Sequence, residues 1–254
     1  MARIALLSLA FLAVLQLAAC SALLPSSAAL PEEAASISTP WALASSGTPN
    51  ALAWQHFKLP GRQPSQFTYA HEDGRHAMAA SAMSSASMWR QVLRVEPADL
   101  GKVKFSWKVP ELIEQADMAL RDADESPVRI VLAFDGDHAR FSQKNAMLSE
   151  LARLLTGEEL PYATMMYVWC NQCEPGSVIV SPRTDRIRKL VVESGMGKLQ
   201  QWVDYERAVR ADFEKVFGEA PGALMSISLM TDTDIPQSIA RAWYGPITLL
   251  PAPP

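Results

Sequence analysis

The chain has 254 residues, of which 49% are hydrophobic and 20% are charged, a composition typical of a globular protein and not of a disordered one. Its formal net charge of −4 provides no basic surface for nucleic acid, so no nucleic-acid partner is expected. The same acidic balance is unsuited to binding anionic lipid through the protein surface itself.

Residues 1–19 have the features of a secretory signal peptide. Arg3 supplies a positive charge, and residues 4–15 form an apolar run shorter than the roughly 20 residues that cross a membrane. The ending Leu17-Ala18-Ala19-Cys20 resembles the bacterial lipoprotein signal, in which the cysteine receives a lipid and becomes the new N-terminus. The resemblance implies a membrane anchor at Cys20.

The residue after the lipidated cysteine helps to determine which bacterial membrane holds the protein. In lipoproteins an acidic residue there often marks retention at the inner membrane, whereas this chain has Ser21. We therefore expect a protein of the bacterial cell envelope, anchored in the outer membrane and facing the periplasm.

The chain after the signal divides into two parts. Residues 20–50 are rich in Ala, Ser and Pro, which favours a tether between the lipid and a folded body. Residues 51–250 contain neither an internal repeat nor a second linker and are expected to form a single domain.

Alternation of apolar and polar residues predicts strands in most of that domain. Val103, Phe105 and Trp107 alternate with polar residues, and the Asp73-Gly74 pair favours a β-hairpin over residues 67–79. Further strands are expected over residues 88–95, 128–134, 162–169, 177–180, 187–193, 224–230 and 242–249.

Two segments have the period of a helix instead. Residues 142–156 begin with the capping residue Ser142 and end before Gly157, and residues 204–217 begin with Asp204 and end before Gly218. The first helix has its apolar residues on one face: Met147, Leu148, Leu151, Leu154 and Leu155. Because strands outnumber helices and do not alternate with them, we predict a mainly β fold, an antiparallel jelly-roll-like β-sandwich with two peripheral α-helices.

Several sequence blocks carry a family resemblance. They are TGEELPYATMMYVW (156–169), VESG (192–195), WVDYER (202–207), ADF (211–213), FGEAPG (217–222), LMTDTD (229–234) and WYGPI (243–247). On these blocks the chain resembles the bacterial domain-of-unknown-function family 3047, a family of secreted proteins. The resemblance implies no activity. Its strand pattern is similar to the jelly-roll sandwiches of carbohydrate-binding modules, which makes a glycan a candidate ligand by analogy of fold alone.

Cys170 and Cys173 are the cysteines that remain after Cys20. Their spacing is shared by redox and zinc motifs. A redox pair normally lies at a helix N-terminus and a zinc site needs two more ligands, whereas this pair follows an apolar strand. A disulfide or an unlinked pair in a loop is therefore favoured.

Asp232 and Asp234 lie at the end of a predicted strand. Carboxylates one residue apart can bind calcium or a polyol, and they can equally form turns or meet arginines. Calcium is the single cofactor considered, and no other metal is expected.

An acidic loop containing Asp122 and Asp124 precedes Arg129. A glycosidase needs two carboxylates roughly 5–10 Å apart, and the alternative is that these acids are solvated residues of turns. Further along, Glu206, Arg207 and Asp212 form either an ion-pair cluster that fixes a helix to the sheet or a ligand clamp.

Three hypotheses about function follow. The first is a non-enzymatic, lipid-anchored envelope domain that binds a ligand, with a glycan as the candidate; Trp54, Trp89, Trp202 and Trp243 are either stacking platforms for it or core residues. The second is a hydrolase of envelope polysaccharide that uses paired carboxylates. The third is a structural or assembly lipoprotein.

Overall fold

The structure is a computed structural model that describes residues 39–45, 48, 51–233 and 238–252. The expected signal peptide, Cys20 and Asp234 lie outside this part of the chain. Among the described residues, no helix is both long enough and apolar enough to cross a membrane.

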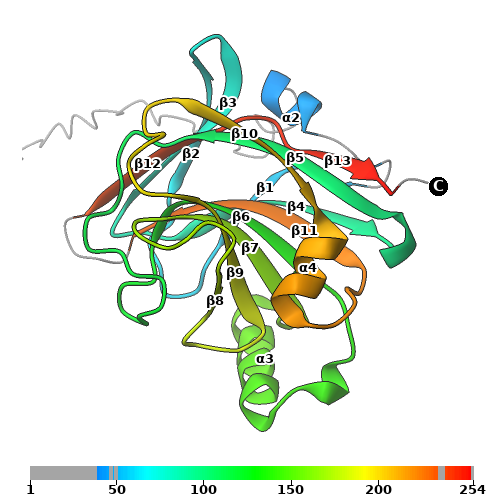
Figure 1. Ribbon diagram of the computed structural model, residues 1–254. Helices are drawn as coiled ribbons and strands as arrows, with labels where there is room; N and C mark the ends of the chain where they lie inside the picture. The colour runs from blue at the N-terminus through cyan, green and yellow to red at the C-terminus, as the bar shows by residue number, and fades with distance from the viewer. Residues whose placement is uncertain (1–38, 46–47, 49–50, 234–237, 253–254) are drawn as a thin grey trace, which may run out of the picture. The chain divides into compact units, whose positions relative to one another are not determined.

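The described residues form thirteen strands in two sheets (Figure 1). Sheet A has the order β1 (Gln55–Lys58), β4 (Ser87–Val95), β11 (Leu224–Asp232), β6 (Ser126–Phe134), β7 (Ala163–Cys170), β9 (Ile187–Ser194) and β8 (Val178–Val180). Sheet B has the order β10 (Trp202–Ala208), β5 (Leu100–Lys108), β12 (Ile239–Tyr244), β3 (Arg75–Met83) and β2 (Gln66–Glu72), with β13 (Thr248–Pro251) also paired to β5. Neighbouring strands are antiparallel except for the parallel pair β7 and β9. The prediction of a mainly β, sandwich-like fold is confirmed.

The main hydrophobic core includes inward-facing residues from both sheets. Alternate residues of β5, among them Phe105 and Trp107, are buried as the sequence pattern predicted. Phe105 stacks on Tyr167 of β7 with 5.5 Å between ring centroids, which joins sheet B to sheet A. Strand β6 is buried on both faces, so its outward-facing residues also lie in protein surroundings. This double burial places Arg129 away from water.

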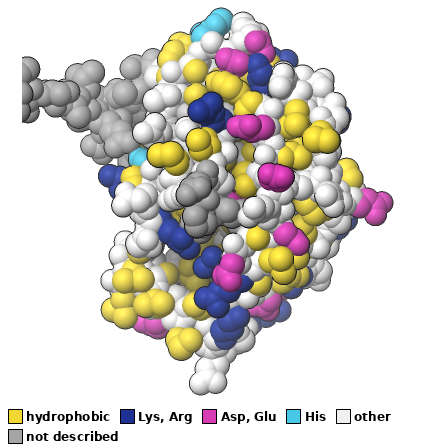
Figure 2. Space-filling model, turned by 90° about the vertical axis from the view of Figure 1, so that its left-hand side faces the viewer, with side chains coloured by type: hydrophobic (Ala, Val, Ile, Leu, Met, Phe, Trp, Pro, Cys, Tyr) yellow, Lys and Arg dark blue, Asp and Glu magenta, His cyan; other side chains and the backbone are white. Residues whose placement is uncertain are grey.

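Helix α3 (Gln143–Thr156) matches the first predicted helix. The Ser142 side chain accepts a hydrogen bond from the Asn145 backbone N–H, and Gly157 ends the helix with a φ of 79°. The left-handed conformation at Gly157 is one that glycine adopts without steric cost. The helix projects from the lower side of the sandwich in Figure 1, and hydrophobic side chains are visible on the lower part of the surface in Figure 2.

The second predicted helix is shorter than expected, and its start was wrong. Helix α4 covers Val209–Phe217 and ends at Gly218 as predicted, but residues 202–208 form β10. These residues alternate between half-buried and exposed along β5, so pairing with a sheet edge prevails over the helix signal. Asp204 is therefore not a helix cap, and it binds Arg75 instead.

A short helix, α2 (Pro40–Ala44), lies within the range that the sequence indicated as tether. Its Trp41 is fully buried and packs against Trp54, with 5.0 Å between ring centroids. The 3₁₀ turns η1 (Pro97–Asp99) and η2 (His138–Arg140) complete the helical elements of the described residues. The folded body thus includes residues before position 51.

The single strand expected over residues 242–249 is two strands, β12 and β13, with Gly245 between them. A Cβ at Gly245 would lie 2.1 Å from Ser106 Oγ, so a larger residue at this position would require the Ser106 side chain to move. The predicted hairpin of β2 and β3 is present, and its turn residues Asp73 and Gly74 have φ values of 47° and 78°.

Candidate functional site

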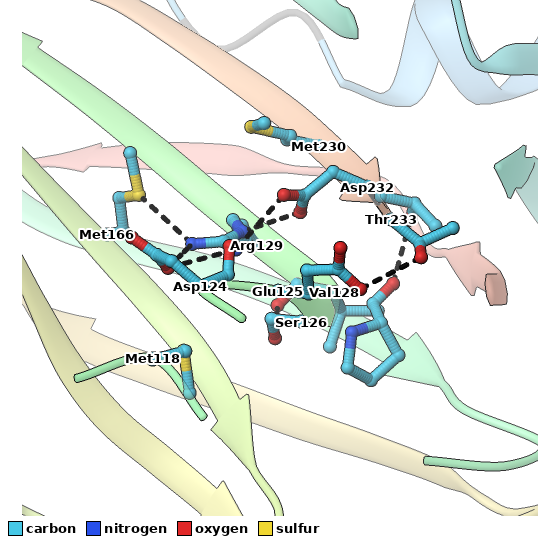
Figure 3. Close-up of polar contacts among 12 residues, drawn as sticks. Met118, Asp124, Glu125, Ser126, Val128, Arg129, Met166, Met230, Asp232 and Thr233 are labelled. Carbon is cyan, nitrogen blue, oxygen red and sulfur yellow. Dashed lines mark hydrogen bonds and ion pairs between the residues drawn. The ribbon is translucent and has the colours of Figure 1, made fainter. Parts of the chain in front are cut away.

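Three of the residues singled out from the sequence meet in one buried cluster on sheet A (Figure 3). Arg129 projects from β6, Asp232 lies at the end of β11, and Asp124 lies in the loop that leads into β6. We call these three residues, together with Glu125 and Lys189, the Arg129 cluster. The Arg129 cluster connects sheet A to the acidic loop that precedes β6.

Arg129 binds carboxylates on both sides. Its Nε donates to Asp232 Oδ1 at 2.7 Å and its second terminal nitrogen to Asp232 Oδ2 at 3.1 Å, a bidentate pair. The guanidinium also donates to Asp124 Oδ1 at 3.3 Å and to the Asp124 carbonyl at 2.8 Å. With 3% of its side chain exposed, Arg129 has lost nearly all its hydration, and these bonds replace it.

Sequence reasoning singled out neither Glu125 nor Lys189, which lies on β9. Its Nζ lies 2.6 Å from Asp124 Oδ1 and donates to the Met118 carbonyl at 3.0 Å, and 1% of its side chain is exposed. The signal that could have found it is a lysine inside the apolar strand of residues 187–193. A charge in such a run is either buried with a partner or faces water, and Asp124 is the partner.

The remaining acid of the cluster has a neutral partner. Glu125 Oε2 accepts a hydrogen bond from Thr233 Oγ1 at 2.8 Å, and both residues are buried. Asp124 and Glu125 thereby hold the end of the acidic loop against β9, β6 and β11.

Burial and mutual attraction set the protonation states in the Arg129 cluster. Burial lowers the pKa of Lys189 to about 8, and the neighbouring Arg129 charge acts in the same direction. Burial raises the pKa of Asp232 to about 6, although the Arg129 guanidinium opposes this change. Desolvation works against the charge on Arg129, but the carboxylates of Asp232 and Asp124 raise its pKa. The cluster therefore keeps its ion pairs at neutral pH.

This arrangement does not form a pair of opposed catalytic acids. Asp124 and Asp232 both bind the same guanidinium, so the two carboxylates flank a cation where a glycosidase would hold substrate. Arg129 also supplies the positive charge that calcium would bring to Asp232. Among the described residues, no three or more His, Cys, Asp or Glu side chains are placed to hold a metal ion.

The other predicted site residues lie elsewhere. Asp122 is exposed and outside the cluster. Arg207 binds Asp212 through two bonds of 2.9 and 2.6 Å, and Tyr167 donates to the same carboxylate at 2.9 Å, so this group fixes α4 to the sheets. Glu206 is separate from that group and pairs with lysines of β5 on the surface.

Cys170 and Cys173 are joined by a disulfide that closes the turn after β7. Cys170 is buried beside Met118, Val168 and Val191, in a small hydrophobic cluster beneath the acidic loop. The pair thus lies next to the Arg129 cluster and has surroundings typical of a structural bridge.

The tryptophans named as stacking platforms are not free rings. Trp54 and Trp89 are buried in the core. Trp202 lies under the Arg75 guanidinium at 5.2 Å and Trp243 under Lys108 Nζ at 5.3 Å, so a cation of the protein covers each half-buried ring. These positions give no support to sugar stacking.

Helix α3 presents a second candidate surface that sequence reasoning described but did not interpret. Four of its apolar residues are exposed, Met147 at 65%, Leu151 at 50%, Leu154 at 76% and Leu155 at 59%. We call these four residues the α3 apolar face. The buried residues of the same helix are Asn145 and Ser149, which are polar.

Polar contacts hold α3 to the body. Asn145 Nδ2 donates to Asp185 at 2.7 Å, and its Oδ1 accepts from Thr184 at 2.8 Å. Ser149 Oγ accepts from the Leu160 N–H at 3.3 Å. The helix therefore turns Asn145 and Ser149 inward and three of its four leucines outward, the reverse of an ordinary surface helix. The fourth, Leu148, is half-buried.

Comparison with known proteins gives one family match. Residues 52–248 match the family model described as "Protein of unknown function (DUF3047)". The matched range contains β1 to β12 and the first residue of β13. No curated protein matches the chain.

Proposed function

Because the chain belongs to the DUF3047 family, whose description gives no activity, we propose a function from the geometry: a non-enzymatic envelope domain that docks a partner protein through α3. The observation that carries this proposal is the outward orientation of the α3 apolar face. In this proposal the Arg129 cluster stabilises the fold and does not bind the partner, since its charges are already paired with one another.

The exposed leucines have an energetic consequence. Fully burying a Leu or Met side chain is worth about 1.5–3 kcal/mol, and the fold forgoes most of this at four neighbouring positions. Contiguous exposed apolar side chains of this kind are typical of interaction sites. Docking would recover the burial energy that folding leaves unused.

The spacing of the face indicates the mode of docking. Positions 147, 151, 154 and 155 follow the i, i+4, i+7, i+8 pattern of a helix that enters an apolar groove. The charges beside it are mixed, since Lys144, Glu150 and Arg153 are exposed and Glu150 pairs with Arg153 at 2.6 Å. An interfacial membrane helix is usually rich in lysine and arginine, so a groove on a protein suits α3 better than an anionic lipid surface.

The anchor is the second part of the proposal. A lipid on Cys20 would hold the domain at the outer membrane, facing the periplasm, and would leave α3 free to dock. The apolar surface would then serve assembly, which is the third of the sequence-based hypotheses.

Site-specific photo-crosslinking in the producing cell tests the proposal. A photoreactive residue at position 154 should give one discrete adduct with another protein, and Leu151→Asp should suppress it. Leu120 is a matched control because it is 57% exposed but lies outside α3. Equal adducts from positions 154 and 120, or adducts from position 154 with lipid or a second copy of the chain alone, would refute the proposed partner.

A further inference from the structure

The β2–β3 hairpin places two histidines directly opposite each other. His71 pairs with His76 in the register, one step from the turn, and both are exposed. The hairpin extends beyond its neighbours at the top of Figure 1, and histidine side chains are visible at the top of Figure 2. The Glu72–Arg75 pair flanks the two-residue turn, so the alternation of antiparallel pairs makes the next pair, His71 and His76, a non-hydrogen-bonded one, where side chains are closest.

The ring geometry is suited to one shared metal ion. The two ring centroids are 5.4 Å apart, and the rings are inclined by 69°. Because metal–nitrogen bonds are about 2.1 Å long, each centroid would lie about 3.2 Å from a bound ion. A tetrahedral angle would then separate the centroids by about 5.2 Å, and the right angle of a tetragonal Cu²⁺ ion by about 4.5 Å. The observed spacing therefore matches a tetrahedral ion directly, and a tetragonal one requires the two exposed rings to move about 1 Å closer.

A neighbouring hydroxyl orients one of the imidazoles. Tyr69 Oη lies 2.6 Å from His76 Nδ1, and the two rings stack with 5.9 Å between centroids. When Nδ1–H donates to Oη, Nε2 carries the free lone pair. A hydrogen bond from the other ring nitrogen is the usual support of a metal-binding histidine.

The nearby carboxylates already have partners. Glu72 and Asp73 both bind Lys108, and Asp204 binds Arg75. Within the described residues there is no third His, Cys, Asp or Glu ligand beside the two imidazoles. An ion bound here would keep water in its other coordination positions.

We propose that His71 and His76 form a two-imidazole site for a divalent late transition metal, with Cu²⁺ bound most tightly. Imidazole suits copper, nickel and zinc, and Cu²⁺ ranks above Ni²⁺ and Zn²⁺ in intrinsic affinity for nitrogen ligands. The site is independent of the docking proposed for α3, since it lies on sheet B and shares no residue with that helix.

Titration of the full chain in detergent with Cu²⁺ alone tests the site. Electron spin-echo envelope modulation should count two imidazoles on the bound ion, and a backbone amine at the chain terminus would not add to that count. His71→Ala and His76→Ala should each reduce the count to one and lower the Cu²⁺ affinity at least about ten-fold. Tyr69→Phe should keep both imidazoles and lose about ten-fold in affinity, the lower end of the usual cost of removing a supporting hydrogen bond.

His138→Ala is the matched control, because His138 is also partly exposed but pairs with Glu159. It should leave the imidazole count and the affinity unchanged. A single imidazole in the wild-type chain, a count of two that persists in His71→Ala, or an equal loss in His138→Ala would overturn the proposal. His71→Gln gives a second test that preserves side-chain volume and polarity, and circular dichroism would verify the fold of each variant.

Discussion

Arg129 and Asp232 form a bidentate ion pair between adjacent strands of sheet A, with nitrogen–oxygen distances of 2.7 and 3.1 Å. Both side chains are buried, so the pair has little water to replace a lost partner. Asp232→Ala should lower the free energy of unfolding by about 3–5 kcal/mol, the usual cost of leaving a buried charge uncompensated. Urea denaturation followed by tryptophan fluorescence measures this change.

The surface pair Arg75 and Asp204 provides the control for that measurement. Its Nη1–Oδ1 distance is also 2.7 Å, but the side chains are 42% and 65% exposed. Asp204→Ala should therefore cost less than about 1 kcal/mol. Equal losses in the two variants would contradict the role assigned to burial.

Stability should rise with pH between about 8 and 10 because of Lys189. Burial lowers its pKa to about 8 in the folded protein, from an ordinary value of 10.5. In this range the unfolded chain binds the proton more often than the folded one, so raising the pH favours folding. At about 1.4 kcal/mol per pH unit the gain between pH 8 and 9.5 is at most about 2 kcal/mol.

Lys189→Met is the matched variant for the pH series. The urea midpoints of both proteins are measured at pH 7.5, 8.5 and 9.5. The midpoint should rise with pH in the wild type because of Lys189, and this rise should be missing in the variant. The series stops below pH 10 because burial also raises the pKa of Tyr167, whose titration would then contribute. Parallel profiles for the two proteins would contradict the buried lysine.

Gly222→Ala should destabilise the fold by about 1–3 kcal/mol, in the range of other overpacked sites. A Cβ at this position would lie 2.1 Å from the Asp135 carbonyl oxygen, which is backbone and cannot rotate away. Gly197→Ala is the control, since nothing lies within 4 Å of its Cβ position. That change should be neutral or stabilise by up to about 1 kcal/mol, and thermal unfolding of both variants would decide.

Leu154→Ser should change the free energy of unfolding by less than about 0.5 kcal/mol, because Leu154 is already 76% exposed. Leu132→Ala, at a fully buried position of β6, should cost about 2–5 kcal/mol in the same urea assay. A large loss in Leu154→Ser would mean that the α3 apolar face serves the fold and not a partner.

Cys20→Ala should abolish incorporation of a labelled fatty acid if the lipoprotein-type ending is used. The control is Cys173→Ala, which removes a cysteine of the folded domain and should leave labelling intact. Labelling that persists in Cys20→Ala would refute the anchor.

The sequence predicted the fold where its signal was local. Alternation in β5, the Asp73-Gly74 turn and the Ser142 and Gly157 caps all depend on a few adjacent residues, and all are confirmed. Residues 204–208 were misassigned to a helix because their strand character depends on β5, which is far away in the sequence. A helical period likewise tells which residues share a face and not what that face contacts, so α3 was found without its outward orientation.

The candidate site was predictable only in part. Asp124 and Arg129 drew attention as an acidic loop followed by a charged strand residue, and Asp232 as one of two carboxylates spaced by one residue. Their meeting depends on the pairing of β6 with β11, which no sequence spacing reveals. Lys189 joins them from β9 across the intervening β7, so its role follows from topology alone.

The burial of Trp41 also limits the length of the chain that connects Cys20 to the folded domain. With Trp41 inserted in the core, the tether from Cys20 is at most twenty-one residues and not the thirty that composition suggested. A chain of that length reaches at most about 75 Å when fully extended. A lipid on Cys20 would therefore confine the domain to a layer near one membrane, and any partner of α3 would have to come within that layer.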